Sequence, residues 1–258
     1  MRLLSKRAHV RRVQQQLLRV ISSVALAVSM LLLVNQGLTV IAAILLAVSK
    51  WQVLLGGPRL WLHNLWDNLV DIVFIFTVLA LLVLYVESLW LQLAVIGLYL
   101  MWQLAIKPMS GVSGHAVQSL LTLTLASIIV FIQQEALFGV IGSMAALWLV
   151  AATTADHFLI SLTDDVSIRR LLSAIWSLVV VQVVWLFGHW LVFYVFFDGL
   201  ILIPQAALVL LLLGYMFGAM YYDHFRKQLN RRRLYLYLGL ITLVTVILVV
   251  GSEWVEQL

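Results

Sequence analysis

The sequence predicts an all-α polytopic membrane protein, a bundle of about nine transmembrane helices in one domain over residues 1–258. Of the 258 residues, 64% are hydrophobic and 10% are charged, and the mean hydropathy is +1.08. Soluble proteins are about half apolar and a quarter charged, so this composition excludes a soluble globule and a disordered chain. The chain has no cysteine, which excludes a disulfide-stabilised secreted domain and zinc sites built on thiolates.

Apolar stretches long enough to cross a bilayer recur along the chain. A spanning helix needs about 20 mostly apolar residues, because the hydrocarbon core is about 30 Å thick and unpaired backbone groups are costly there. The short connection at Asn35–Gly37 predicts a tight hairpin between the first two spans, and Pro204 predicts a bend one turn inside the eighth. The expected spans are Leu18–Val34, Leu38–Leu55, Leu69–Val86, Ser88–Ile106, His115–Gln133, Ala136–Ile160, Leu171–Phe197, Leu200–Tyr222 and Leu234–Val250.

The basic residues predict the orientation, because cytoplasmic loops of membrane proteins are enriched in Lys and Arg. With the N-terminus inside, all 16 basic residues fall on the cytoplasmic side, and the outer side holds only acids. We therefore expect a cytoplasmic N-terminus and an outer C-terminus, in an inner or plasma membrane. The basic segment 1–17 predicts contact with anionic lipid headgroups. Nucleic acid is not an expected partner, because no basic domain lies outside the bilayer.

Residues 58–68 predict an amphipathic helix at the cytoplasmic interface. Pro58 suits the first turn of a helix, and apolar and polar positions then separate onto two sides. Continued into the third span, such a helix aligns His63, Asp67 and Asp71 at four-residue steps.

Ionisable side chains at membrane depth are costly and are therefore functional candidates. They gather on the predicted cytoplasmic side, whereas His189 lies well inside the expected seventh span. The motif Asp-His-Phe occurs at 156–158 and 223–225, at the ends of two spans, and residues 115, 118, 119 and 122 form a polar helix face. We expect a polar cavity open to the cytoplasm, with candidate residues Asp71, Asp67, His63, His115, Asp156, His157, Asp223, His224 and His189.

Each of these groups also has a purely structural interpretation. Histidine at a helix C-terminus is favoured by the helix dipole, and Asp223 has nearby cations in Arg226 and Lys227. The loop acids at 164 and 165 are expected to form a solvated cluster with the arginines at 169 and 170.

The leading functional prediction is a small transport or membrane-assembly component, because no nucleotide-binding motif and no complete nucleophile, base and oxyanion set is visible. Whether the chain is an enzyme stays open, and no cofactor is firmly predicted. The alternative is a metal-dependent transferase or phosphatase for a lipid-linked phosphate at the inner leaflet. It would hold a divalent metal ion through Asp67, Asp71, Asp156 and His157, and the phosphate through Lys107 or Arg59.

A second alternative is a non-catalytic scaffold for a partner membrane protein or for another copy of the chain. Gly214 and Gly218 form a GxxxG motif, which lets helices approach closely in membranes. A lipid-facing strip of small residues around these glycines would favour the scaffold.

Overall fold

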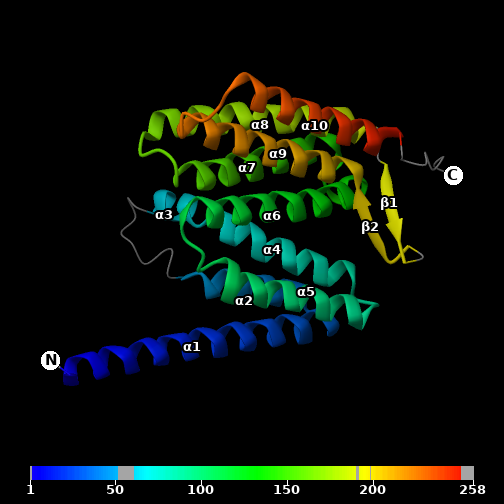
Figure 1. The fold of residues 1–258 in the computed structure, drawn as a ribbon. Helices are drawn as coiled ribbons and strands as arrows, with labels where there is room; N and C mark the ends of the chain where they lie inside the picture. The colour runs from blue at the N-terminus through cyan, green and yellow to red at the C-terminus, as the bar shows by residue number, and fades with distance from the viewer. Residues whose placement is uncertain (1, 52–60, 190–191, 198, 251–258) are drawn as a thin grey trace. The chain divides into compact units, whose positions relative to one another are not determined.

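The computed structural model of the protein describes residues 2–51, 61–189, 192–197 and 199–250 (Figure 1). The chain is mainly helical and divides into two compact units. The first comprises Met1–Leu65 and Ile75–Met109, and the second comprises Trp66–Phe74 and Ser110–Leu258. The helix α4 (Leu69–Leu84) therefore contributes its first residues to the second unit and the rest to the first.

The first unit contains α1 (Arg2–Asn35), α2 (Thr39–Ser49), most of α3 (Trp61–Asp67), and α5 (Leu89–Met101) with the π-helical turn η3 (Trp102–Ile106). The predicted hairpin between the first two spans is confirmed, because α1 and α2 pack together across a turn in which Gly37 has a φ of 73°. Asn35 and the buried Gln92 exchange two amide hydrogen bonds of 3.1 and 3.2 Å, which tie α1 to α5.

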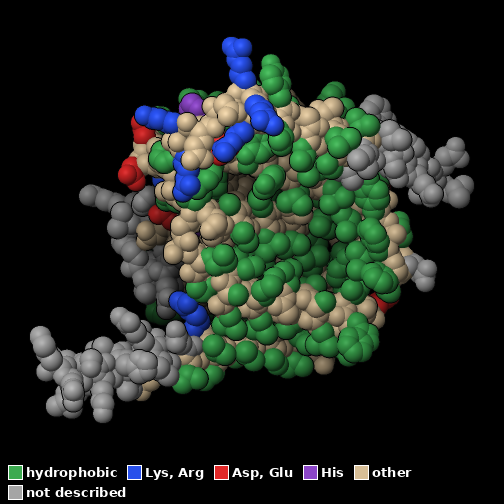
Figure 2. Space-filling model, viewed as in Figure 1, with side chains coloured by type: hydrophobic (Ala, Val, Ile, Leu, Met, Phe, Trp, Pro, Cys, Tyr) green, Lys and Arg blue, Asp and Glu red, His purple; other side chains and the backbone are tan. Residues whose placement is uncertain are grey.

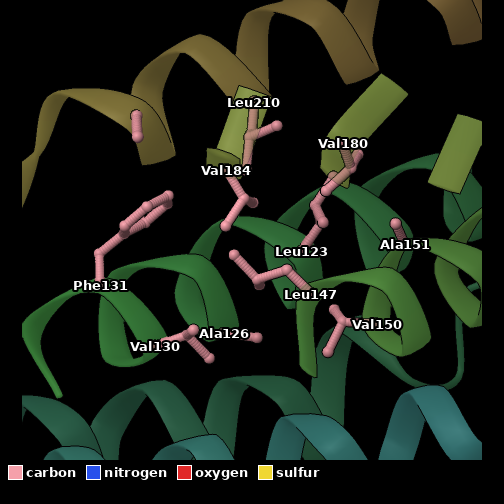
Figure 3. Packing of buried hydrophobic residues seen from close by; sticks show 11 residues of the cluster. Leu123, Ala126, Val130, Phe131, Leu147, Val150, Ala151, Val180, Val184 and Leu210 are labelled. Atoms are coloured by element: carbon pink, nitrogen blue, oxygen red, sulfur yellow. The ribbon is translucent and has the colours of Figure 1, made fainter. Parts of the chain in front are cut away.

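The second unit contains five long helices and a small sheet: α6 (Gly111–Ile132), the π-helical turn η4 (Gln134–Phe138), α7 (Gly139–Leu159), α8 (Val166–Gly188), β1 (Phe193–Phe196), β2 (Ile201–Pro204), α9 (Gln205–Phe225) and α10 (Arg231–Val250). Its core lies between α6, α7, α8 and α9, where side chains such as Leu123, Leu147, Val184 and Leu210 interdigitate (Figure 3). The β-strands pair antiparallel, with Phe193 opposite Pro204.

Two predicted element boundaries are wrong, both next to this sheet. The helix expected up to Phe197 ends at Gly188, because the following residues form β1, and the exposed His189 caps the helix instead of lying inside a span. Pro204 does not bend a helix: it ends β2 and precedes the first residue of α9. Proline suits this position, because it has no N–H to donate and its φ is fixed near the value found here, −62°.

The interfacial segment is also interrupted. A single helix was expected from 58–68 into the third span, but α3 ends at Asp67 and α4 begins at Leu69. Asp67 is exposed, whereas Asp71 in the first turn of α4 is buried. Arg59 and the side chain of His63 lie outside the described residues, so the predicted strip is not tested at those positions.

Six helices in the described part of the chain are long and apolar enough to cross a membrane, by length and composition. Two further apolar helices are shorter, α2 with 11 residues and α4 with 16. At about 1.5 Å per residue, α2 is about 16 Å long, roughly half the thickness of a hydrocarbon core. The expected total of nine spans and the orientation of the termini therefore stay predictions.

Candidate functional site

The charged residues of the second unit gather where α7 turns into α8 and α9 turns into α10. We call this the polar end of the unit, formed by the first turns of α4, α6, α8 and α10 and the last turns of α7 and α9. Figure 2 shows Lys and Arg side chains over these turns, while the surface along the helices is mostly apolar. Six of the predicted site residues belong to the polar end: Asp71, His115, Asp156, His157, Asp223 and His224.

A pair of histidines joins α6 to α7 at the polar end. The Nδ1 atom of His115 lies 3.1 Å from the Nε2 atom of His157, and the ring centroids are 4.5 Å apart. The same Nε2 atom lies 2.7 Å from the Oε1 atom of Gln118, one turn along α6 from His115. Both rings are half-buried. Three residues of the polar helix face predicted for 115–122 thus contact α7: His115, Gln118 and Ser119.

One arrangement of protons satisfies both contacts of the His157 Nε2 atom. A glutamine carbonyl oxygen only accepts hydrogen bonds, so the Nε2 atom of His157 carries a hydrogen and donates it to Gln118. This N–H also faces the Nδ1 atom of His115, which must then be the unprotonated, accepting nitrogen of its ring. In this arrangement each neutral imidazole keeps one unprotonated nitrogen, Nδ1 of His115 and Nδ1 of His157, and of these two only His115 Nδ1 lies in the contact between the rings.

Asp156, next to His157 in the chain, is held by an ion pair. Its Oδ1 atom accepts from Arg169 Nε at 2.6 Å, and its Oδ2 atom accepts from the indole N–H of Trp66 at 3.1 Å. The carboxylate and the guanidinium are both buried, with side chains 8% and 10% exposed. The prediction that Arg169 belongs to a solvated loop cluster is therefore wrong. Its buried ion pair with Asp156 links the end of α7 to the start of α8.

Two acidic side chains act electrostatically on the His157 ring, those of Asp156 and Asp71. Asp71 is buried at the start of α4, where the helix dipole favours a negative charge. Deeper in the bundle, the Ser119 hydroxyl donates to the Thr154 carbonyl at 2.7 Å. The buried hydroxyl of Thr122, one turn beyond Gln118, has no hydrogen-bond partner.

The second Asp-His-Phe motif has a different environment. Asp223 accepts from Arg233 Nη1 at 3.1 Å and from the Tyr237 hydroxyl at 3.0 Å, both on α10. The expected partners Arg226 and Lys227 are therefore not the ones it binds. His224 is exposed and makes no contact comparable to the histidine pair. The two motifs share an aspartate that binds an arginine of the next helix, but only the first brings its histidine into a cluster.

The remaining predicted residues do not join this cluster. Asp67 and His189 are exposed, and His189 Nδ1 approaches the carbonyl of Trp185 at 2.7 Å within its own helix. Lys107 is exposed at the end of η3, in the first unit. No group of three His, Cys, Asp or Glu side chains that could hold a metal ion occurs among the described residues.

Two pockets adjoin the polar end, and both are lined mainly by apolar side chains. The polar cavity expected from the sequence stays a prediction. One, of about 250 Å³, lies among α6, α7, α8 and α9; the other, of about 450 Å³, lies between α6 and α9. Gly214 and Gly218 line both pockets, and a Cβ atom on Gly214 would lie 3.0 Å from Leu120. Gly214 faces side chains of α6 and α8, and Gly218 faces the Phe158 ring of α7.

The sequence interpretation missed three residues that shape the site: Arg169, Trp66 and Gln118 as a partner of His157. A signal for the first was present, because Arg169, Ser173 and Ser177 repeat at four-residue steps and form the buried face of α8. Trp66 and Gln118 meet partners that are 90 and 39 residues distant in the chain, so local spacing holds no signal for either contact.

Comparison with known proteins adds no assignment, since no protein-family model, curated protein or solved structure matches this chain.

Proposed function

We propose that this protein is a multi-pass integral membrane protein that acts as a small proton-coupled transport component. In this proposal the chain crosses an inner or plasma membrane about nine times, with its N-terminus and the polar end of the second unit in the cytoplasm. Six long apolar helices support the membrane location, and the confinement of Lys and Arg to one set of loops supports the orientation. Anionic headgroups contact the basic cytoplasmic surface.

The observation that carries the proposal is the contact between His115 and His157. Histidine is the side chain whose ordinary pKa lies within the physiological range, and ionisable groups inside membrane helices are by default functional. The pair takes up one proton at His115 Nδ1, the accepting nitrogen of the 3.1 Å contact. Two N–H groups then point at each other, so protonation breaks the contact between α6 and α7.

Several charged and polar groups surround the pair. The carboxylates of Asp71 and Asp156 attract positive charge on His157, whereas burial of its ring and the neighbouring His115 oppose that charge. Asp156 is fixed by Arg169 and Trp66, so the motion falls on the imidazoles and on α6. The hydroxyl of Thr122, buried without a partner, provides a further polar group on the way into the bundle.

The experiment is a proton flux measurement on the purified full-length protein in liposomes. A potassium gradient with valinomycin sets the membrane potential, and an entrapped pH-sensitive dye reports proton movement. We expect flux above that of protein-free liposomes, and a decrease of about tenfold or more in His157→Gln, within the range that positioned proton-transfer groups contribute.

His224→Gln is the matched control, because it removes an exposed histidine from the same polar end and should leave the flux unchanged. Wild-type flux equal to that of empty liposomes refutes the proposal. So does a His157→Gln protein that conducts as well as the wild type.

A further inference from the structure

The half of α9 nearest the polar end is flanked by two apolar hollows. The helices α6 and α9 pack together, and Leu123 and Leu210 contribute to the same buried core cluster. Beyond Gly214 they leave the two pockets of about 250 and 450 Å³, which share Leu120, Phe158, Gly214 and Gly218 as lining residues. Because the two pockets share these four lining residues, they lie next to each other beside α9.

The hollows follow directly from small residues. Gly214, Gly218 and Ala219 recur on α9 where larger side chains would fill the space. A Cβ atom on Gly218 would sit at an ordinary 3.7 Å from the Phe158 ring, so there is room at this position that the sequence does not use. The larger pocket lies within the range of about 300–1,000 Å³ typical of ligand sites.

A cation stands at the polar rim of the larger pocket. Arg226 follows α9 and lines this pocket, with its guanidinium carbon 4.5 Å above the centre of the Tyr222 ring. Two other arginines at the polar end, Arg169 and Arg233, are each bound to an aspartate. Arg226 is exposed, and the structure pairs it with no carboxylate among the described residues, so its N–H groups are accessible to an anion from outside the chain.

We infer that these pockets bind an anionic membrane lipid, with the acyl chain in the apolar hollows and the phosphate at Arg226. A guanidinium matches the geometry of a phosphate group. The apolar lining favours a lipid over a free anion, and the unpaired cation favours an anionic over a zwitterionic headgroup. The inference agrees with the cytoplasmic orientation proposed above, where anionic lipids face the basic loops, but it does not depend on the histidine pair.

The test is native mass spectrometry of the full-length protein in detergent, with phosphatidylglycerol and phosphatidylcholine of identical acyl chains added in equal amounts. We expect the wild type to retain phosphatidylglycerol about tenfold more strongly. Arg226→Gln should abolish this preference, whereas Gly218→Leu should reduce retention of both lipids by filling the pockets. Arg232→Gln is the matched control, because it removes an exposed arginine of the same end that lines neither pocket.

Three results would overturn the inference. Equal retention of the two lipids by the wild type would rule out a headgroup-specific site. Equal losses of phosphatidylglycerol in Arg226→Gln and Arg232→Gln would show that diffuse surface charge, and not Arg226, retains the anionic lipid. Displacement of the lipid by millimolar inorganic phosphate would show an anion site without a bound chain. Gly218→Ala, whose added Cβ fits without a clash, serves as the folding control: it should retain lipid, and Gly218→Leu is compared at equal helical circular dichroism.

Discussion

Replacing Arg169 by glutamine should destabilise the protein strongly, because it leaves the carboxylate of Asp156 buried without its cation. The Asp156 side chain is only 8% exposed, and its shortest contact is the 2.6 Å bond to Arg169 Nε. Removing one partner of a buried ion pair costs about 3–5 kcal/mol. The Trp66 N–H at 3.1 Å remains as a donor, so we expect the lower part of this range.

The assay is thermal unfolding of the purified protein in detergent, followed by tryptophan fluorescence at a fixed scan rate. A chain of 150–250 residues loses about 2–4 °C in Tm per kcal/mol, so a loss of about 3 kcal/mol predicts a decrease of about 6–12 °C. Arg170→Gln is the matched control, because the neighbouring arginine is exposed, and its Tm should change by less than about 2 °C.

A double variant separates the ion pair from its parts. Asp156→Asn with Arg169→Gln removes both charges and keeps an acceptor for the Trp66 indole. Because neutral replacements of buried ion pairs are often tolerated, the double variant should regain most of the Tm lost in Arg169→Gln. The reasoning is refuted if Arg169→Gln unfolds at the wild-type temperature, or if the double variant is less stable than this single variant.

Two further predictions concern the first unit and the orientation. Gly37→Ala should lower the free energy of unfolding by about 1–2 kcal/mol, because a φ of 73° is strained for any residue with a Cβ atom. Gly97→Ala, in the middle of α5 with open space around its Cβ position, should not lower it, and equal effects in thermal unfolding would count against the argument. In this naturally cysteine-free chain, Glu87→Cys should react with an impermeant maleimide in intact cells, and Asp164→Cys only after lysis; the reverse pattern would invert the proposed orientation.

The positions of the long helices could be predicted, because a run of about 20 apolar residues is visible in the local sequence. The helix ends next to the small sheet could not be predicted. The segment Phe193–Phe196 is as apolar as the helix before it, so hydropathy alone does not separate the two. Aromatic and β-branched residues with a following glycine turn favour strands, and here Gly199 with a φ of 93° closes the hairpin.

In the candidate site, too, one part could be predicted from the sequence and another part could not. The polar face of α6 was predictable, because residues three and four apart share one side of a helix. Which cation binds Asp156 was not, since Arg169 and Arg170 are neighbours in sequence and differ only in the side of α8 on which they lie. Packing decides between them: Arg169 is on the face that carries Ser173 and Ser177 toward the interior.

The two Asp-His-Phe motifs show how far local sequence can indicate function. In both, the aspartate accepts from an arginine in the next helix and from an aromatic donor, Trp66 in one case and Tyr237 in the other. The aspartate thus has the same anchoring role twice, and its substitution should affect stability more than proton flux. The histidines differ, because only His157 meets a second imidazole and a glutamine. If His157→Gln lowered Tm as much as Arg169→Gln but left proton flux intact, the histidine would be an anchor as well, and the motif would be structural throughout.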